Sequence, residues 1–327
     1  MRTFRFLGAA AWGVVDIHQL TETARRAESI GYSGLVVPDH LLDQHAPIPV
    51  LAAIAAVTER LRIGTFMLNA GLRHPAVLAQ ELASLDVLSG GRLDIGVGAG
   101  WNRLEHSSIG VPFEQHAARI SRLGETIAIL KGCFGDRPFS FTGRHYNIQK
   151  HNSLPKPIQR PHPPLLVGGG SRRALTLAGQ EADIVGLAPR LLPGDRSRPT
   201  LDPRSLTAAA TEEKISWIRE AAGKRFGRIE LNIYPTVGGL DADLAAGPVA
   251  VTNHARAEAE LRADGLRRLT GVNITAEEIL ESPHIFIGSV EGLTQKFIEL
   301  RERFGISSIM VTEIDQLAPV VERLAER

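Results

Sequence analysis

The chain has 327 residues, of which 43% are hydrophobic and 22% charged, so it can bury the core of one large globular domain or two modest ones. Its formal net charge is +1 at pH 7 and the charges are interspersed, which gives no support to nucleic acid or a membrane surface as a partner. The single cysteine, Cys133, excludes an internal disulfide framework, and no signal peptide or membrane-spanning run is recognisable, so we expect a cytoplasmic protein.

Short apolar or β-branched runs alternate with longer stretches of helical period along the chain. Eight strands are predicted at Phe4–Leu7, Gly34–Val37, Arg62–Leu68, Leu93–Val97, Pro164–Val167, Ile184–Leu187, Glu230–Tyr234 and Ser308–Val311. Helices with one buried stripe are predicted at Gln19–Ile30, Ile48–Thr58, Pro75–Leu88, His116–Lys131, Arg172–Gly179 and Lys214–Ala222. Eight βα units favour a (β/α)8 TIM barrel over an open doubly wound sheet, as one domain over residues 1–327.

Three longer segments interrupt this alternation, at about residues 136–163, 188–210 and 241–283, and we expect them to be insertions at the C-terminal mouth of the barrel. The first contains a predicted hairpin at Phe139–Tyr146, followed by a run of prolines. The second interleaves prolines with arginines, which is typical of a mobile basic loop or of a flap that orders over an anionic ligand. The third is expected to add helices beside the mouth.

The most informative stretch is a glycine-rich turn after the fourth predicted strand. Gly96, Gly98 and Gly100 alternate with small residues and are followed by Trp101 and Asn102. The missing Cβ atoms allow backbone N–H groups to approach a flat, phosphorylated ligand, although a tight turn at a strand end would also use glycine. The spacing does not match the G-x-G-x-x-G dinucleotide fingerprint, and no phosphate-loop signature is present.

A second glycine turn follows the fifth predicted strand. Gly168, Gly169 and Gly170 lead into Ser171, a residue type that caps helices, and then into Arg172. Free backbone N–H groups and the positive end of a helix would converge there, which favours a phosphate site over a tight turn alone.

Polar residues also follow the second and third predicted strands, and in a barrel such positions form the active site. His40 can donate, accept or hold a proton near neutral pH, so it is the candidate catalytic residue. Its neighbour Asp39 can act on a ligand, support the site electrostatically or cap the next element, and Asn69 lies at the end of the third strand. Histidines and acidic residues lack ligand spacing on one helix face, so no metal is expected, and no G-x-S-x-G motif supports a serine hydrolase.

Five stretches together resemble the bacterial luciferase-like monooxygenase superfamily, and within it the branch of probable oxidoreductases that use coenzyme F420. These stretches are Val37–His40, Arg62–Thr65 with His74–Gln80, Gly90–Trp101, Pro164–Gly170 and Ser282–Ser289. The resemblance covers nearly the whole chain. It implies a TIM barrel, usually a homodimer, which holds a flavin or deazaflavin ring flat at the C-terminal mouth and acts on a small molecule.

The resemblance also implies roles for individual residues. Asp39 and His40 would lie beside the ring, with His40 donating a proton or orienting the substrate. A non-prolyl cis peptide is typical of the third strand and would fall within Phe66–Leu68. The expected cofactor-binding residues are Asp39, Met67, Leu68, Asn69, Gly98, Ala99, Gly100, Trp101, Gly168, Gly169, Gly170, Ser171 and Arg172.

The leading functional hypothesis is therefore hydride transfer between F420 and an unidentified small organic substrate, with His40 managing the proton. The alternative is a reduced-FMN-dependent monooxygenase that uses O2, and a third possibility is a barrel that binds a flavin or a protein without catalysis. Sugar-phosphate dehydrogenases of the superfamily carry a catalytic glutamate directly after the glycine turn, where this chain has Trp101. Trp101 would instead form an apolar wall that favours a hydrophobic or planar substrate.

Overall fold

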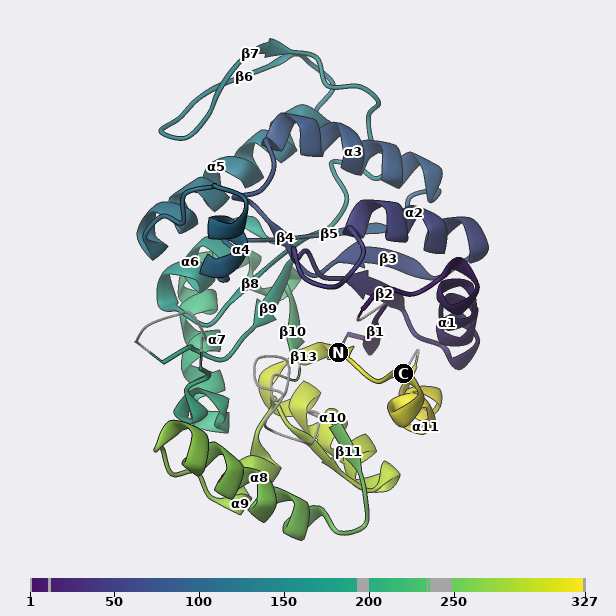
Figure 1. The fold of residues 1–327 in the computed structure, drawn as a ribbon, viewed down its shortest axis with the longest axis vertical. Coiled ribbons are helices and arrows are strands. Elements are labelled where there is room, and N and C mark those ends of the chain that lie inside the picture. The colour runs from purple at the N-terminus through teal and green to yellow at the C-terminus, as the bar shows by residue number, and fades with distance from the viewer. Residues whose placement is uncertain (1, 11–12, 193–199, 234, 236–248, 326–327) are drawn as a thin grey trace.

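The structure is a computed structural model that describes residues 2–10, 13–192, 200–233, 235 and 249–325. In it, eight parallel strand positions close into a barrel (Figure 1). The strands are, in chain order, β1 (Arg5–Ala9), β2 (Gly34–Val37), β3 (Arg62–Thr65) continued by β4 (Leu68–Asn69), β5 (Leu93–Gly98), β8 (Leu165–Gly169), β9 (Ile184–Leu187), β10 (Glu230–Ile233) and β13 (Ile306–Val311). The sheet closes because β1 pairs with both β13 and β2, and β3 pairs with β5. The predicted TIM barrel is confirmed, while the predicted strand end at Tyr234 lies outside the described residues.

Helices surround the strands, as expected for right-handed βα units. They are α1 (Ile17–Ile30), α2 (Pro47–Val57), α3 (Pro75–Leu88), α5 (His116–Phe134), α6 (Arg172–Glu181), α7 (Ala208–Ala222), α10 (Val290–Phe304) and α11 (Ile314–Leu324). The 3-10 helix η2 (Gly223–Arg228) directly follows α7. The first of them shows why these boundaries arise: Asp16 and Gln19 form a capping box, and Gly31 ends the helix in the left-handed conformation. No helix in the described ranges is long and apolar enough to cross a bilayer.

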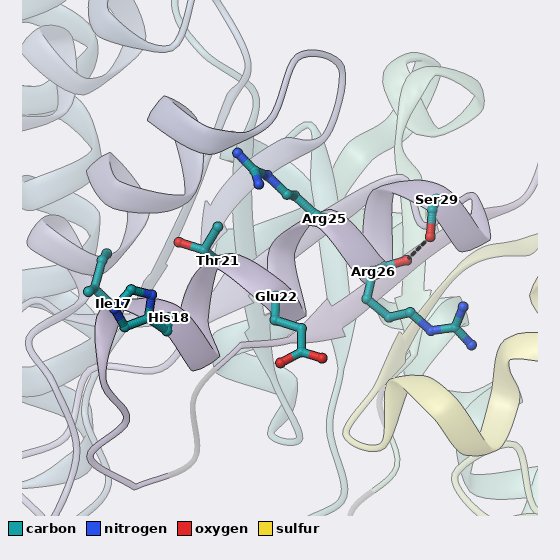
Figure 2. A pocket seen from close by; sticks show the side chains of 7 residues that line it. All are labelled: Ile17, His18, Thr21, Glu22, Arg25, Arg26 and Ser29. Carbon is teal, nitrogen blue, oxygen red and sulfur yellow. Dashed lines mark hydrogen bonds between the residues drawn. The ribbon is translucent and has the colours of Figure 1, made fainter.

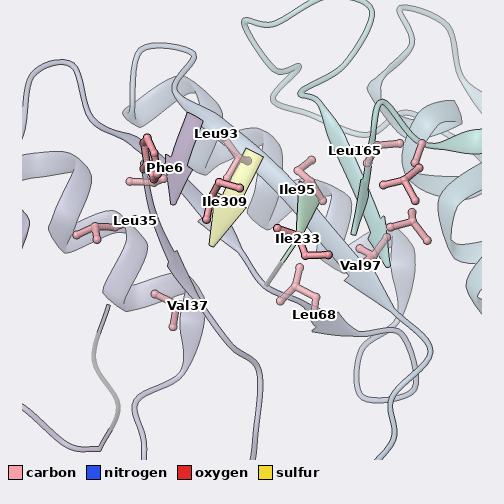
Figure 3. Packing of buried hydrophobic residues seen from close by; sticks show 14 of the residues in the cluster. Phe6, Leu35, Val37, Leu68, Leu93, Ile95, Val97, Leu165, Ile233 and Ile309 are labelled. Atoms are coloured by element: carbon pink, nitrogen blue, oxygen red, sulfur yellow. The ribbon is translucent and has the colours of Figure 1, made fainter. Parts of the chain in front are cut away.

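Alternate residues of the strands face two different cores. On β1, Phe6 lies in the large core between strands and helices, whereas Leu7 lies in a smaller cluster that fills the barrel together with Val36, Leu166 and Met310. Figure 3 shows part of the large core, which is built from strand residues such as Leu35, Val37, Ile95, Val97 and Ile309. The buried barrel interior means that a ligand must enter at one end of the strands.

The N-terminal end of the barrel is occupied by paired charges from the first or second residue of four strands. Arg5 contacts Asp94 at 2.5 Å and Glu230 at 3.0 Å, and Arg62 also pairs with Asp94. Burial tends to lower the pKa of Arg5, but its two acidic neighbours outweigh that effect and raise it. These mutually neutralised charges suit a structural role, which leaves the opposite end for the active site.

The insertion at 136–163 forms the expected hairpin, made by the antiparallel strands β6 (Phe139–Thr142) and β7 (Asn147–His151). It follows α5 and precedes β8, so it leaves from the N-terminal end of the barrel rather than from the mouth, and it lies outside α3 and α5 (Figure 1). Glu125 of α5 accepts hydrogen bonds from three backbone N–H groups of the hairpin turn. At its tip, the Tyr146 hydroxyl reaches the carbonyl of Ala70, just past β4, at 3.3 Å.

The other two insertions follow β9 and β10 and therefore lie at the C-terminal mouth, as expected. The described part of 188–210 contains a bridge between Leu191 and Leu201 and the 3-10 helix η1 (Pro203–Leu206). The described part of 241–283 contains β11 (Val249–Val251), α8 (Ala255–Thr270) and α9 (Ala276–Glu281), and β11 pairs with β12 (Phe286–Gly288). Leu206 shares a second core with these helices, and Ser282 donates to its carbonyl at 2.6 Å, so the two insertions form one lobe. The arginines predicted to form a flap at 196 and 198 lie outside the described residues.

Candidate active site

One short helix at the mouth braces the loops that follow β2 and β4. This helix, α4 (Arg103–Ser108), begins directly after the glycine turn of β5, and the Asn102 side chain caps it by accepting a hydrogen bond from the Leu104 N–H at 3.0 Å. Its buried residues are Glu105 and His106, and each contacts a different loop.

Glu105 binds the predicted catalytic residue. Its Oε1 lies 2.8 Å from Nδ1 of His40 and accepts a hydrogen bond from Asn102 Nδ2 at 2.7 Å. The Glu105 side chain is 3% exposed and that of His40 is 19% exposed. The Trp101 ring packs edge-on against the imidazole, with ring centroids 5.3 Å apart. His40 is thus held on two sides at the mouth.

Sequence analysis did not identify Glu105 as a site residue. The spacing Asn102-x-x-Glu105 is typical of a helix N-terminus, and this local signal is present in the sequence. It gives no information about His40, which is 65 residues away in the chain.

Asp39 holds two loops together. Its carboxylate, which is almost fully buried, accepts a hydrogen bond from the Asn69 N–H at 2.9 Å and forms a two-point ion pair with Arg73, with Nη2 3.0 Å from Oδ1. Both oxygens are therefore engaged within the protein. Asp39 supports the site from behind, and its expected contact with a cofactor stays a prediction.

Asn69 is oriented by His106 and Gly71. Its amide Nδ2 donates to His106 Nε2 at 3.0 Å, and its Oδ1 accepts from the Gly71 N–H at 2.9 Å. Burial lowers the pKa of His106 below its ordinary value of 6.5, which favours the neutral imidazole that can accept this bond. Gly100 must be glycine here, because its φ is +71° and a Cβ would lie 2.5 Å from the Asn69 oxygen.

The third barrel strand is interrupted by a cis peptide between Phe66 and Met67, as the resemblance implied. The interruption separates β3 from β4 and directs the Met67 side chain toward the ends of β5 and β8. A Cβ placed on Gly168 would lie 3.2 Å from Met67 Cε, and one on Gly98 would lie 3.7 Å from it. Leu68, by contrast, belongs to the large core between strands and helices.

The glycine turn after β5 is held from outside the barrel. Ala99, Gly100 and Trp101 are half-buried, and the guanidinium of Arg119, on α5, donates to the Gly100 carbonyl. The backbone of this turn is therefore fixed while part of it stays accessible at the mouth.

The second glycine turn packs closely against its neighbours. A Cβ would lie 2.9 Å from the Gly186 carbonyl at Gly168, 2.7 Å from Ala174 at Gly169 and 2.4 Å from the Pro189 carbonyl at Gly170. This close approach supports the tight-turn interpretation, but all three glycines remain half-buried at the mouth.

The residues after this turn start α6. The Ser171 hydroxyl caps the helix by accepting from the Ala174 N–H at 3.3 Å. Arg172 is 64% exposed and pairs with Glu220 of α7 at 3.1 Å, so its guanidinium is directed away from the turn that it was expected to complete.

A family profile described as luciferase-like monooxygenase matches residues 3–267, which is most of the chain. The chain belongs to the luciferase-like monooxygenase family. Both coenzyme classes of this family occur among its relatives. A segment of 141 residues is 38% identical to the FMNH2-dependent dimethylsulfone monooxygenase of Pseudomonas putida. This segment covers 43% of this chain and 39% of that protein. A segment of 173 residues is 32% identical to the F420-dependent glucose-6-phosphate dehydrogenase of Kineococcus radiotolerans, and this segment covers 50% of each chain.

The luciferase-like chain thus spans half or less of the length of these relatives. Solved structures share its fold over the full length. An F420-dependent secondary alcohol dehydrogenase, solved with an F420–acetone adduct, aligns with a TM-score of 0.71 at 18% identity and covers 100% of both chains. A long-chain alkane monooxygenase aligns with a TM-score of 0.71 at 15% identity and covers 99% of this chain and 90% of that chain.

Among the described residues, neither a metal cluster nor the hollow on α1 offers a second candidate site in this luciferase-like protein. Within the described ranges, no three His, Cys, Asp or Glu side chains gather as metal ligands. A shallow hollow on the outer side of α1 is lined by residues of that helix alone, so no polar groups from separate elements converge there (Figure 2). Its lining residues are Ile17, His18, Thr21, Glu22, Arg25, Arg26 and Ser29. The mouth around His40 remains the candidate active site.

Proposed function

We propose that this protein is an oxidoreductase that transfers a hydride between coenzyme F420 and a small organic substrate, with His40 giving or taking the proton. The observation that carries the proposal is the placement of His40, which is tied to a buried carboxylate and lies at the same end of the barrel as the two glycine turns. A proton-transfer group beside a flat, side-chain-free backbone surface suits redox chemistry on a planar coenzyme.

The residues at the C-terminal ends of β5 and β8, together with Met67, fit such a coenzyme. Half-buried glycine backbone and the Met67 thioether offer a smooth, polarisable surface for a ring, and the N-terminus of α6 beyond Ser171 suits a phosphate. We propose that Gly98–Trp101, Met67 and Gly168–Ser171 hold the coenzyme. When bound, the deazaflavin would supply the two-electron hydride chemistry.

The substrate is proposed to be small and largely apolar. Trp101 forms one wall beside His40, and the nearby loops carry the exposed apolar side chains Leu41, Leu42 and Leu104. His40 orients the substrate oxygen and exchanges its proton, while the apolar residues limit water near the reacting carbon.

The second candidate is a reduced-FMN-dependent monooxygenase that consumes O2. It is favoured by the 38% identity to a monooxygenase of that kind, which exceeds the identity to the F420-dependent relative. Both candidates use the same mouth and the same supporting residues.

The proposal is tested with oxidised F420, a panel of small primary and secondary alcohols, and strict exclusion of air. We expect loss of F420 absorbance with at least one apolar alcohol, and a His40→Ala variant should oxidise the same alcohol at least about 100-fold more slowly. If F420 stays oxidised with every alcohol tested while FMNH2 and O2 are consumed with an apolar substrate, the monooxygenase replaces the dehydrogenase as the function.

A further inference from the structure

The two ring nitrogens of His40 are not equivalent in this structure. Nδ1 faces Oε1 of Glu105 at 2.8 Å, so the hydrogen bond between them has a direction. A carboxylate that is ionised can only accept, and in a neutral imidazole only one nitrogen carries a proton. The role of Glu105 therefore decides which nitrogen is protonated.

The neighbours of Glu105 fix that role. The Leu104 N–H donates to Asn102 Oδ1 at 3.0 Å, which turns the amide nitrogen of Asn102 toward Glu105. That nitrogen can only donate, and it lies 2.7 Å from the same Oε1 that faces His40. Oε1 thus accepts one hydrogen bond from Asn102 and is left to accept a second from Nδ1 of the imidazole.

The charge of Glu105 is also placed for His40. Asp39, the other buried carboxylate near the mouth, is neutralised by Arg73. Over the described ranges, the ion-pair partner of Glu105 is His40 itself. When the imidazole takes up a proton, Glu105 supplies the counter-charge at close range in a buried setting.

We propose that Glu105 is a positioning residue for His40: its carboxylate holds the proton on Nδ1, so that Nε2 is the atom that exchanges a proton with the substrate. The catalytic part of this statement rests on the proposed function. In alcohol oxidation the hydroxyl proton would pass to Nε2 as the alcohol becomes a carbonyl, and the bound deazaflavin would supply the two-electron acceptor for the hydride. The imidazolium keeps the proton on Nδ1, which donates to Glu105, and would later release the Nε2 proton to water.

The tautomer is measured directly by NMR of the ring nitrogens in protein labelled with 15N-histidine, at a pH where the imidazoles are neutral. A His40→Ala spectrum identifies the His40 signals among those of the 11 histidines. We expect a protonated Nδ1 and an unprotonated Nε2 in the wild type. In Glu105→Ala the proton should move predominantly to Nε2, whereas Glu105→Gln, whose oxygen can still accept, should keep it on Nδ1. A wild-type proton on Nε2, or an unchanged tautomer in Glu105→Ala, would overturn the assignment.

Steady-state kinetics and the melting temperature together distinguish a positioning role of Glu105 from a role in fold stability. Glu105→Ala, which removes the acceptor of the Nδ1 proton, should lower kcat on the order of 100-fold, within the range of general acid–base effects, with little change in the KM for the coenzyme. Glu212→Ala is the matched control, because it removes an exposed carboxylate that pairs with Arg303 and not with His40, and it should leave kcat unchanged. An unchanged kcat in Glu105→Ala with an intact melting temperature would remove Glu105 from the mechanism. Because the NMR arm needs no coenzyme, its outcome is independent of whether F420 is the coenzyme.

Discussion

His40 and Asp39 are adjacent in the chain but are bound to different partners. The Asp39 carboxylate is consumed by Arg73 and the Asn69 backbone, whereas His40 is held by Glu105 and packs against Trp101. At the scale of single residues, the structure separates a support for the loops from a side chain that can exchange protons at the mouth.

Replacing His40 by Ala is expected to lower kcat by about 10²–10⁴-fold, because the substrate proton loses its acceptor. Coenzyme affinity should change little, since the proposed coenzyme contacts come from the glycine turns and Met67. Steady-state kinetics and a binding titration on the same protein test this. An unchanged kcat would remove His40 from the catalytic group.

His106 makes the unfolding free energy of the protein depend on pH on the acid side. Burial lowers its pKa in the folded protein below 6.5, so on acidification the unfolded chain takes up a proton before the folded one does. Stability is therefore fully present above pH 6.5 and falls as the pH drops below it. We expect the acid-side slope of the unfolding free energy to be smaller in His106→Gln, measured by urea denaturation across this range. Identical slopes in both proteins would contradict the assignment.

At the scale of elements, the two mouth insertions are joined to the barrel by a buried lysine. Lys214 of α7 donates to the Ser205 carbonyl of η1 at 2.9 Å. Burial, and then the nearby Arg190, lower its pKa from 10.5 to about 7. The lobe is thus anchored by a group that is costly to charge.

This burial predicts a stability change on the alkaline side. Between pH 7 and 10.5 the unfolded chain holds a proton on Lys214 that the folded chain has lost, so the unfolding free energy contributed by this residue rises with pH across that window. In Lys214→Met this rise should be absent. The difference between the two proteins is the quantity to measure, because Lys296, whose pKa is also lowered to about 7, is present in both. A pH-independent difference would show that Lys214 stays charged.

Local patterns predicted most elements but not the contacts between them. The apolar runs and helical periods indicated the eight barrel strands, and the glycine turns indicated the mouth. The run Arg62–Leu68 was expected as one strand, and only the family resemblance anticipated the cis peptide that divides it into β3 and β4. Glu105 carried a helix-start signal, but its partner His40 is set by the closure of the barrel, which no local pattern encodes.

At the scale of the whole molecule, the barrel divides its charges between its ends. Paired charges close the N-terminal end through Arg5, Asp94 and Glu230, and the C-terminal end carries His40, the glycine turns and the added lobe. The insertion at about 136–163 was expected at the mouth because long excursions in a barrel tend to be binding loops, but its place after α5 puts its base at the other end. Chain order decides the side, because helix-to-strand connections lie at the N-terminal end of the strands.

The resemblance also predicts a homodimer. Light scattering coupled to size-exclusion chromatography should give a mass of about twice 35.4 kDa at micromolar concentration. A mass of one chain over the same concentration range would make this protein an exception to the expectation.

The measurement that tests the central claim most directly is a parallel titration of the protein with F420 and with FMN, followed by fluorescence, with Gly100→Ala as a control for binding at the mouth. The account predicts that F420 binds at least about tenfold more tightly than FMN, a difference of about 1.4 kcal/mol. Binding should weaken in Gly100→Ala, whose added Cβ would collide with Asn69. Tighter binding of FMN would contradict the F420 assignment, and binding of neither would contradict the redox function itself.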